Sequence, residues 1–280
     1  MKKLYVGGDI ITMSGEEAEA VLTEDGIIQK VGLHQEFAEE EQDETIEQHD
    51  LQGKTLLPGF VDPHGHISMV GTLSVMANLR EDESFADIQA TLKKYIQDNN
   101  IAKGDVVVGF GYDHNFLKEE RHPTKEILNE VSTEHPIFIS HTSGHVGCAN
   151  DAALKKAGVD ATTPDEEGGV IGRIEGSNEP NGYLEEGSMM TVQRQIAAEM
   201  ELDHVELALL SQDIYLQNGI TTAQDGATSY DVLELFKSLG EAKKWKMDIA
   251  MYPTVVDNPE DVEKNREYVN QYHNLLKIGG

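Results

Sequence analysis

The sequence predicts an α/β protein in which a small β unit is followed by parallel strand–helix units, with an α/β insertion after the first strand of those units. Two patterns carry the prediction: apolar and polar residues alternate over residues 1–57, and helical and strand patterns alternate from residue 191 onward. The hydrophobic share of 39% is ordinary for a folded chain. We therefore expect a β unit at 1–57 and a strand–helix part at 58–280 that contains the insertion at about 80–188.

The β unit is expected to consist of short strands. LYVGGDIITM is followed by AVLTEDGIIQKVG, in which Asp25-Gly26 is a strong signal for a hairpin turn. LQGKTLLPG supplies a third extended run. Phe60 to His66 then reads as a buried strand with a polar end.

The insertion combines helices and strands. Ser84 can cap a helix over 84–99, whose apolar residues Phe85, Ile88, Leu92, Tyr95 and Ile96 form one stripe. The other expected elements are strands at 105–113 and 136–140, helices at 123–131 and 150–158, and a long loop or hairpin at 159–188.

The last part of the chain has the rhythm of parallel strand–helix units. We expect, in order, a helix at 191–217, a strand at 219–225, a helix at 230–240, a strand at 247–255, a helix at 259–273 and the start of another strand at LLKIGG. Strands that alternate with helices at this spacing indicate a parallel sheet.

The acidic charge excludes some partners. A net charge of −29 disfavours nucleic acid and anionic membrane surfaces. Cys148 is the only cysteine, so no internal disulfide is expected, the cytoplasm is the default compartment, and a buried apolar role is favoured over metal binding for this thiol. We expect neither a signal peptide nor a membrane-spanning helix.

The segment LLPGFVDPHGH carries the chemistry. On a strand, the side chains of His64 and His66 share one face, with Cα atoms about 6.6 Å apart. Two imidazoles so placed can converge on one ion at Zn–N distances of about 2.0–2.1 Å. A bare His-x-His also arises by chance, but its PGF–D–HGH context favours a metal site.

Several motifs together resemble one known family. PGFVDPHGH resembles the signature of the amidohydrolase superfamily, and further motifs follow in the order found in its amidohydrolase-3 branch, which includes N-substituted formamide deformylases and YtcJ-like proteins. These motifs are GYDHNFL, HPTKEILNEVS, HPIFISHTSGHVGCANDAAL, EEGGVIGR, NGYLEE and NGITTAQDGA. The resemblance covers nearly the whole chain and corresponds to the N-terminal portion of such proteins.

The resemblance implies a partial, distorted (β/α)₈ barrel, with residues 1–57 as part of a β-sandwich. It also implies that His64 and His66 are ligands of one or two divalent metal ions, with zinc favoured. The family's other ligands are a Lys, two later His and a general-base Asp, none of which has a matching position here. We expect them beyond residue 280. The chain alone is therefore expected to be inactive and to bind metal weakly.

Two further sites are candidates for substrate contact. His145, in Ser143-Gly144-His145, resembles a family position near the mouth of the active site, although a structural loop histidine is an equal alternative. Asp113 and His114 end a predicted strand, where they can face a cleft or cap a turn.

Two acidic residues are candidates for support of the metal ligands. Asp225 ends the strand GITTAQD and can orient a ligand imidazole. Asp62 lies two residues before His64, and its alternative role is hydrogen bonding at the strand end.

The function expected from these features is metal-dependent hydrolysis of C–N bonds in non-peptide amides, such as N-substituted formamides, by a metal-activated water. A cyclic-amide hydrolase or deaminase on the same scaffold is the alternative, because one fold hosts many reactions. A truncated, non-catalytic scaffold or binding protein is the third hypothesis. The partner expected is a small amide, and a homo-oligomer stays open.

Overall fold

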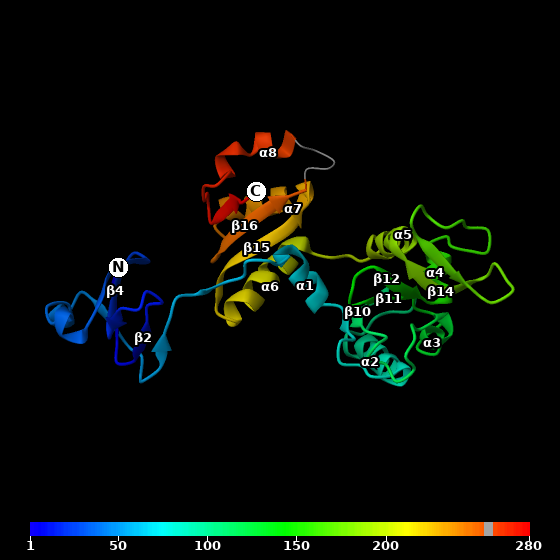
Figure 1. The fold of residues 1–280 in the computed structure, drawn as a ribbon, viewed down its shortest axis with the longest axis horizontal. Helices are drawn as coiled ribbons and strands as arrows, with labels where there is room; N and C mark the ends of the chain where they lie inside the picture. Colours follow the sequence, from blue (N-terminus) through cyan, green and yellow to red (C-terminus); the bar gives the residue numbers. More distant parts are fainter. Residues whose placement is uncertain (255–259) are drawn as a thin grey trace. The chain divides into compact units, whose positions relative to one another are not determined.

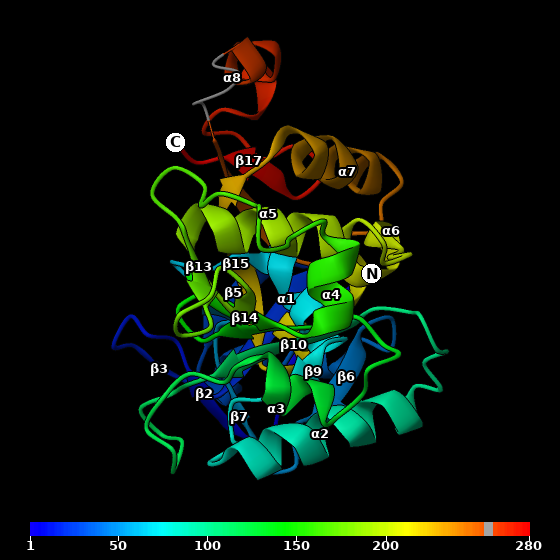
Figure 2. The same cartoon turned by 90° about the vertical axis from the view of Figure 1, so that its right-hand side faces the viewer.

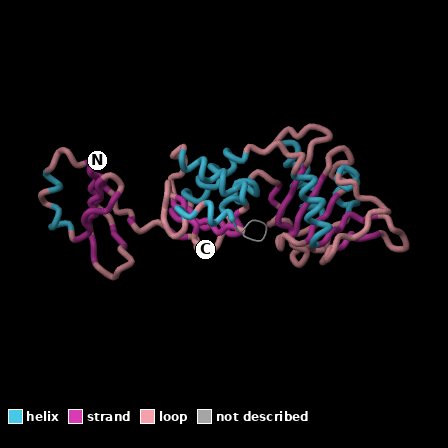
Figure 3. Tube along the Cα trace, turned by 90° about the horizontal axis from the view of Figure 1, so that it is seen from above, coloured by secondary structure: helices cyan, strands magenta, loops and turns pink. Residues whose placement is uncertain are grey.

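A computed structural model describes residues 1–254 and 260–280 (Figures 1 and 3). The chain forms two compact units. Unit 1 contains Met1–Pro63 and Tyr215–Ala223, and unit 2 contains His64–Ile214 and Gln224–Gly280. None of the described helices is long and apolar enough to cross a membrane.

Unit 1 is built mainly from short strands, as the alternating pattern predicts. One sheet has the order β5-β4-β1-β6 and a second has the order β3-β2-β7. Asp25 and Gly26 both have positive φ, 51° and 82°, and form the tight turn between β4 and β5, which confirms the predicted hairpin. The bounds are β1 (Lys2–Val6), β2 (Asp9–Ile11), β3 (Glu17–Ala18), β4 (Ala20–Glu24), β5 (Ile27–Gly32), η1 (His34–Phe37), η2 (Glu40–Gln42), β6 (Glu47–Asp50) and β7 (Thr55–Leu56).

The strand before the two histidines is shorter and more exposed than predicted. β8 (Phe60–Val61) pairs in parallel with the start of β15 (Ile220–Thr228). The two side chains of β8 are 54% and 62% exposed, so the prediction of a buried strand over 60–66 is wrong. The apolar residues of this segment are typical of a strand covered on both faces, but the described residues leave more than half of each of these two residues exposed.

The insertion in unit 2 is a six-stranded sheet of order β13-β14-β12-β11-β10-β9. β10 is parallel to β9 and β11, whereas β12 and β14 run antiparallel to their neighbours. The bounds are β9 (Ala77–Asn78), β10 (Val107–Tyr112), β11 (Ile137–His141), β12 (Val146–Ala149), β13 (Val170–Arg173) and β14 (Pro180–Glu185). The sequence predicts β10 and β11, but β12 was not expected.

Helices cover both faces of this sheet, as Figure 2 shows. Successive residues of a strand point to opposite faces, so Val107 and Val108 belong to different cores. The core with Val107 includes α2 (Phe85–Asp98) and α3 (Lys125–Asn129), and the core with Val108 includes α4 (Asp151–Lys156) and α5 (Glu186–Ala197). Each fully buried aliphatic side chain in these cores stabilises the fold by about 1.5–3 kcal/mol.

Two side-chain caps fix the helix starts that the sequence predicts. Ser84 accepts a hydrogen bond from the backbone N–H of Asp87 at the start of α2. Asn150 accepts one from the backbone N–H of Ala153 at the start of α4. Both caps satisfy N–H groups that have no partner inside their helix.

The prediction of a single helix over 191–217 is wrong, because the structure has two helices there. α5 ends at Ala197, and α6 (His204–Gln217) begins after Asp203. The Asp203 carboxylate accepts hydrogen bonds from the backbone N–H groups of Val205 and Glu206, both at 3.0 Å. This cap starts a new helix within a stretch whose composition is helical throughout.

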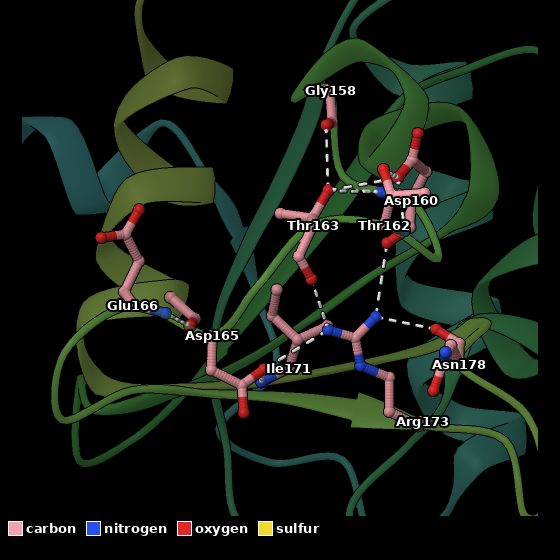
Figure 4. A network of polar contacts seen from close by, with 10 residues as sticks. Gly158, Asp160, Thr162, Thr163, Asp165, Glu166, Ile171, Arg173 and Asn178 are labelled. Atoms are coloured by element: carbon pink, nitrogen blue, oxygen red, sulfur yellow. Dashed lines mark hydrogen bonds and ion pairs between the residues drawn. The ribbon is translucent and has the colours of Figure 1, made fainter.

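The segment 159–188 is a loop followed by the β13–β14 hairpin, and Arg173 joins the two (Figure 4). Its guanidinium donates to the backbone oxygens of Thr163 at 2.6 Å and Asn178 at 2.7 Å. It also lies 3.4 Å from the Asp165 carboxylate. Arg173 on β13 thus holds Thr163 and Asn178, the two ends of the Gly-rich stretch 163–178.

The remaining elements of unit 2 follow the predicted strand–helix alternation. β16 (Asp248–Pro253) and β17 (Leu276–Ile278) pair in parallel, and α7 (Tyr230–Glu241) precedes β16. Where a helix over 259–273 is predicted, the structure has α8 (Glu260–Lys264) and the short 3₁₀ helix η3 (Arg266–Tyr268). Position 259 lies outside the described residues, and so does the end of the strand predicted over 247–255. An eight-stranded barrel is not present in the described residues.

Candidate functional site

His64 and His66 lie just after β8, at the start of α1 (Ile67–Ser74). His66 is the N-cap residue of this helix and forms a single β-bridge with Asp225. The two imidazole rings lie edge to face, with centroids 6.3 Å apart. The pair is therefore brought together by a turn into a helix, and not by a continuous strand as predicted.

A backbone carbonyl fixes the ring of His66. Its Nδ1 lies 2.6 Å from the carbonyl oxygen of Gly226. Because a carbonyl only accepts hydrogen bonds, Nδ1 carries the proton and donates. Nε2 is then the unprotonated atom, with a lone pair for a metal, and histidine ligands are commonly oriented in this way.

The two acidic residues predicted near the histidines both accept hydrogen bonds. Asp225 is fully buried, and its carboxylate accepts hydrogen bonds from the Ser68 backbone N–H at 2.9 Å and the Thr228 hydroxyl at 2.8 Å. It thereby holds the first turn of α1. Within unit 1, Asp62 accepts a hydrogen bond from the Tyr215 hydroxyl at 2.9 Å. The group that orients His66 is the carbonyl of the residue after Asp225, and a carbonyl leaves no signal in a sequence.

The donor set of this pair fits a divalent transition metal. Two exposed imidazoles, one with its tautomer set by Gly226, match the nitrogen ligands that zinc takes. A catalytic zinc usually has three protein ligands. His64 and His66 would therefore hold the ion together with at least one further ligand.

We expect Gly226→Ala to weaken metal binding at His64 and His66. A Cβ at position 226 would lie 3.0 Å from Cε1 of His66, closer than carbon atoms pack, so the ring must move from the carbonyl that orients it. Loss of such an orienting contact lowers metal affinity about 10–100-fold. Zinc affinity measured by chelator competition in a background that carries Asp113→Asn and His141→Ala, so that the other imidazole and carboxylate cluster contributes nothing, tests this. Ala227→Gly, which adds no atom, is the control, and equal affinities for Gly226→Ala and wild type would contradict the orienting role.

A second polar cluster lies at the carboxyl ends of two neighbouring strands of the insertion. Asp113 and His114 directly follow β10, and His141 is the last residue of β11. The parallel register pairs Tyr112 with His141, so the three side chains meet at one edge of the sheet. We call Asp113, His114 and His141 the strand-end cluster. Sequence reasoning singled out Asp113 and His114 but missed His141.

The strand-end cluster is tightly packed. Nδ1 of His114 lies 3.3 Å from Nε2 of His141, which lies 3.4 Å from Oδ1 of Asp113. The backbone N–H of Asn115 and then its side-chain amide donate to the Asp113 carboxylate and lower its pKa, with a further contribution from His141. The carboxylate is therefore ionised at neutral pH.

A third imidazole packs beside the strand-end cluster. The ring of His122 lies on that of His114, with centroids 4.0 Å apart, and its Nδ1 is 3.1 Å from the Tyr112 hydroxyl. Burial, followed by the nearby His114 and His141, lowers the pKa of His122 to about 4, so this ring is neutral at pH 7. Burial likewise raises the pKa of the Tyr112 hydroxyl, which keeps its proton.

His145 and Cys148 lie apart from these contacts. His145 is exposed, and its Nδ1 is 3.1 Å from the Glu186 carboxylate. Cys148 is fully buried in the core with Val107, and burial raises the pKa of its thiol. A protonated, enclosed thiol is a packing residue and not a nucleophile.

Comparisons with known proteins agree with these features. The amidohydrolase family model (Amidohydro_3) matches residues 47–279. YtcJ of Bacillus subtilis (strain 168) is 32% identical over 186 residues, which are 66% of this chain and 35% of YtcJ. The N-substituted formamide deformylase of Arthrobacter pascens is 32% identical over 235 residues, 81% of this chain and 42% of that protein. The chain thus spans about two fifths of the length of these relatives.

A solved structure shows the same fold. The crystal structure of an uncharacterized metal-dependent hydrolase from Pyrococcus furiosus matches 100% of this chain and 55% of its own, with a TM-score of 0.70 and 21% sequence identity. At this identity the match concerns the fold alone. The family match covers most of the sequence, including both histidines after β8. The chain belongs to the amidohydrolase family.

Proposed function

We propose that the protein is a metal-dependent hydrolase of C–N bonds in non-peptide amides, with N-substituted formamides or related small amides as the substrate class. The observation that carries this proposal is the pair His64 and His66, in which the Gly226 carbonyl leaves Nε2 of His66 free for a metal. Family membership and the activity for which the Arthrobacter relative is named support the substrate class.

The residues of this chain have a positioning role in the proposed reaction. When bound, a divalent metal lowers the pKa of water to about 7 and polarises a carbonyl. His64 and His66 would hold the ion. The Gly226 carbonyl keeps the proton of His66 on Nδ1, and Asp225 holds the helix turn that follows His66. The geometry of the two imidazoles therefore depends on a rigid, buried support.

In this proposal, the remaining metal ligands and the general base come from other residues of the gene product. The family resemblance implies a Lys, two further His and a general-base Asp. Residues 1–280 alone would then bind metal at His64 and His66 weakly and turn over no amide, because two imidazoles are fewer than the three ligands usual for catalytic zinc.

Metal removal and a substrate panel test the proposal. We expect the complete gene product that contains this chain to cleave an N-substituted formamide, to lose this activity after chelation and to regain it with Zn²⁺. A hydantoin and an aminopurine are assayed in parallel. Cleavage of these alone would replace the proposed substrate class with a cyclic-amide hydrolase or deaminase. No metal-dependent hydrolysis of any of the three would refute the proposal.

A further inference from the structure

We propose that the strand-end cluster, Asp113, His114 and His141, is a second metal site that binds one divalent transition ion, with zinc preferred. It lies within the insertion and shares no residue with the His64/His66 pair. In residues 1–254 and 260–280, these three residues place one ligand atom each within 4.8 Å of one another. The inference does not rest on the proposed hydrolase function.

The distances fit one face of a coordination tetrahedron. The three ligand atoms are Oδ1 of Asp113, Nδ1 of His114 and Nε2 of His141, and they are separated by 3.3, 3.4 and 3.9 Å. Ligands at about 2.0–2.1 Å from a tetrahedral zinc lie about 3.3–3.4 Å apart. Two separations already have this value, and a small rotation of the His114 ring would bring the third to it.

The cluster is built into the fold and does not consist of free surface side chains. The Cα positions are fixed by the parallel pairing of β10 and β11, where Gly111, with φ of 100°, allows the register shift between Phe110 and Tyr112. Two hydrogen bonds of 2.9 Å from Asn115 hold the carboxylate. Both bonds end on Oδ1, the oxygen that faces the two imidazoles, so an ion binds either Oδ1 together with Asn115 or the second carboxylate oxygen, Oδ2.

Ser143 contacts the ring nitrogen of His141 that faces away from the other two ligand atoms. The Ser143 Oγ lies 2.9 Å from Nδ1 of His141, and the Ser143 backbone N–H donates to the same nitrogen at 3.1 Å. The N–H makes Nδ1 an acceptor, so the ring proton lies on Nε2 while no ion is bound. Binding an ion at Nε2 therefore requires the proton to move to Nδ1, where Ser143 Oγ accepts it and the Ser143 N–H gives up its contact. An outer contact of this kind fixes the tautomer of metal-binding histidines.

The chemistry of the three groups selects the kind of ion. Two imidazoles and one carboxylate suit zinc and its neighbours Co²⁺ and Ni²⁺ better than Mg²⁺ or Ca²⁺, which prefer oxygen ligands. The side chains are 22% exposed for Asp113, 32% for His114 and 10% for His141, so an ion can enter from solvent. Three protein ligands leave a fourth position for water or a substrate group.

The test uses the 280-residue chain carrying His64→Ala and His66→Ala, so that the other pair contributes nothing. We expect equilibrium dialysis to show one Zn²⁺ per chain, and Co²⁺ to give the intense visible absorption of a four-coordinate ion. Asp113→Asn and His141→Ala in this background are each expected to weaken Zn²⁺ binding by more than about 100-fold, and Ser143→Ala by about 10–100-fold. His204→Ala, which removes an exposed imidazole elsewhere in unit 2, is the matched control with unchanged affinity.

Two results would overturn the inference: no saturable Zn²⁺ binding by the background chain, or unchanged affinity in Asp113→Asn. Far-UV circular dichroism checks the fold of each variant. If His141→Ala does not fold, Asp113→Asn decides, because it changes one atom and keeps the shape of the side chain. Failure of this site would leave the proposed hydrolase function untouched, since the background lacks both His64 and His66.

Discussion

Asn150→Ala is expected to destabilise the insertion by roughly 3–5 kcal/mol, because it removes a cap and leaves several buried backbone groups without partners. Asn150 is fully buried. Its Oδ1 accepts from the backbone N–H groups of Ile137 and Ala153, both at 2.9 Å. Its amide donates to the carbonyls of Ser132 and His135, also at 2.9 Å. One side chain thus joins the start of α4 to the start of β11.

This loss is a large fraction of the roughly 5–15 kcal/mol by which domains are stable. Urea denaturation followed by far-UV circular dichroism measures it as a lower midpoint. Asn99→Ala, at the exposed end of α2, is the control and should change the free energy of unfolding by about 0.5 kcal/mol or less. A change below about 1 kcal/mol for Asn150→Ala would show that water satisfies the released groups.

His64→Ala and His66→Ala are each expected to lower metal-dependent amide hydrolysis by the complete gene product more than about 100-fold, since removing a ligand should exceed the effect of removing its outer hydrogen bond. The loss should appear in kcat and in the bound metal together. His204→Ala is again the control, because its imidazole is exposed and lies outside both clusters. Turnover close to that of wild type in either histidine variant would remove the pair from the reaction.

The sequence predicts those parts of the fold that depend on local chemistry. Ser84 and Asn150 sit where a cap is needed, and Asp25-Gly26 has the backbone freedom of its turn, so α2, α4 and the β4–β5 hairpin follow from neighbouring residues. The break between α5 and α6 was missed because Asp203 reads as one more polar residue in a helical stretch. A short strand such as β12 depends on partners that are distant in the chain.

In the candidate sites, too, residues close together in the sequence could be predicted and partners distant in the chain could not. His64 and His66 are adjacent in a recognisable motif, whereas their orienting partner, the Gly226 carbonyl, is 160 residues away from His66 and has no side chain. His141 was missed because it belongs to a different strand from Asp113. A signal did exist: two consecutive strands of a parallel pair, at 107–112 and 137–141, both lead into histidine at their carboxyl ends.

The most direct test of the proposed centre is anomalous X-ray diffraction at the zinc edge from crystals of the metal-loaded gene product. We predict an anomalous peak about 2.0–2.1 Å from a ring nitrogen of both His64 and His66, with Nε2 as the atom for His66. A protein that hydrolyses amides in a zinc-dependent way, but whose peak lies only at Asp113, His114 and His141, would contradict the proposal and move the reaction to the insertion.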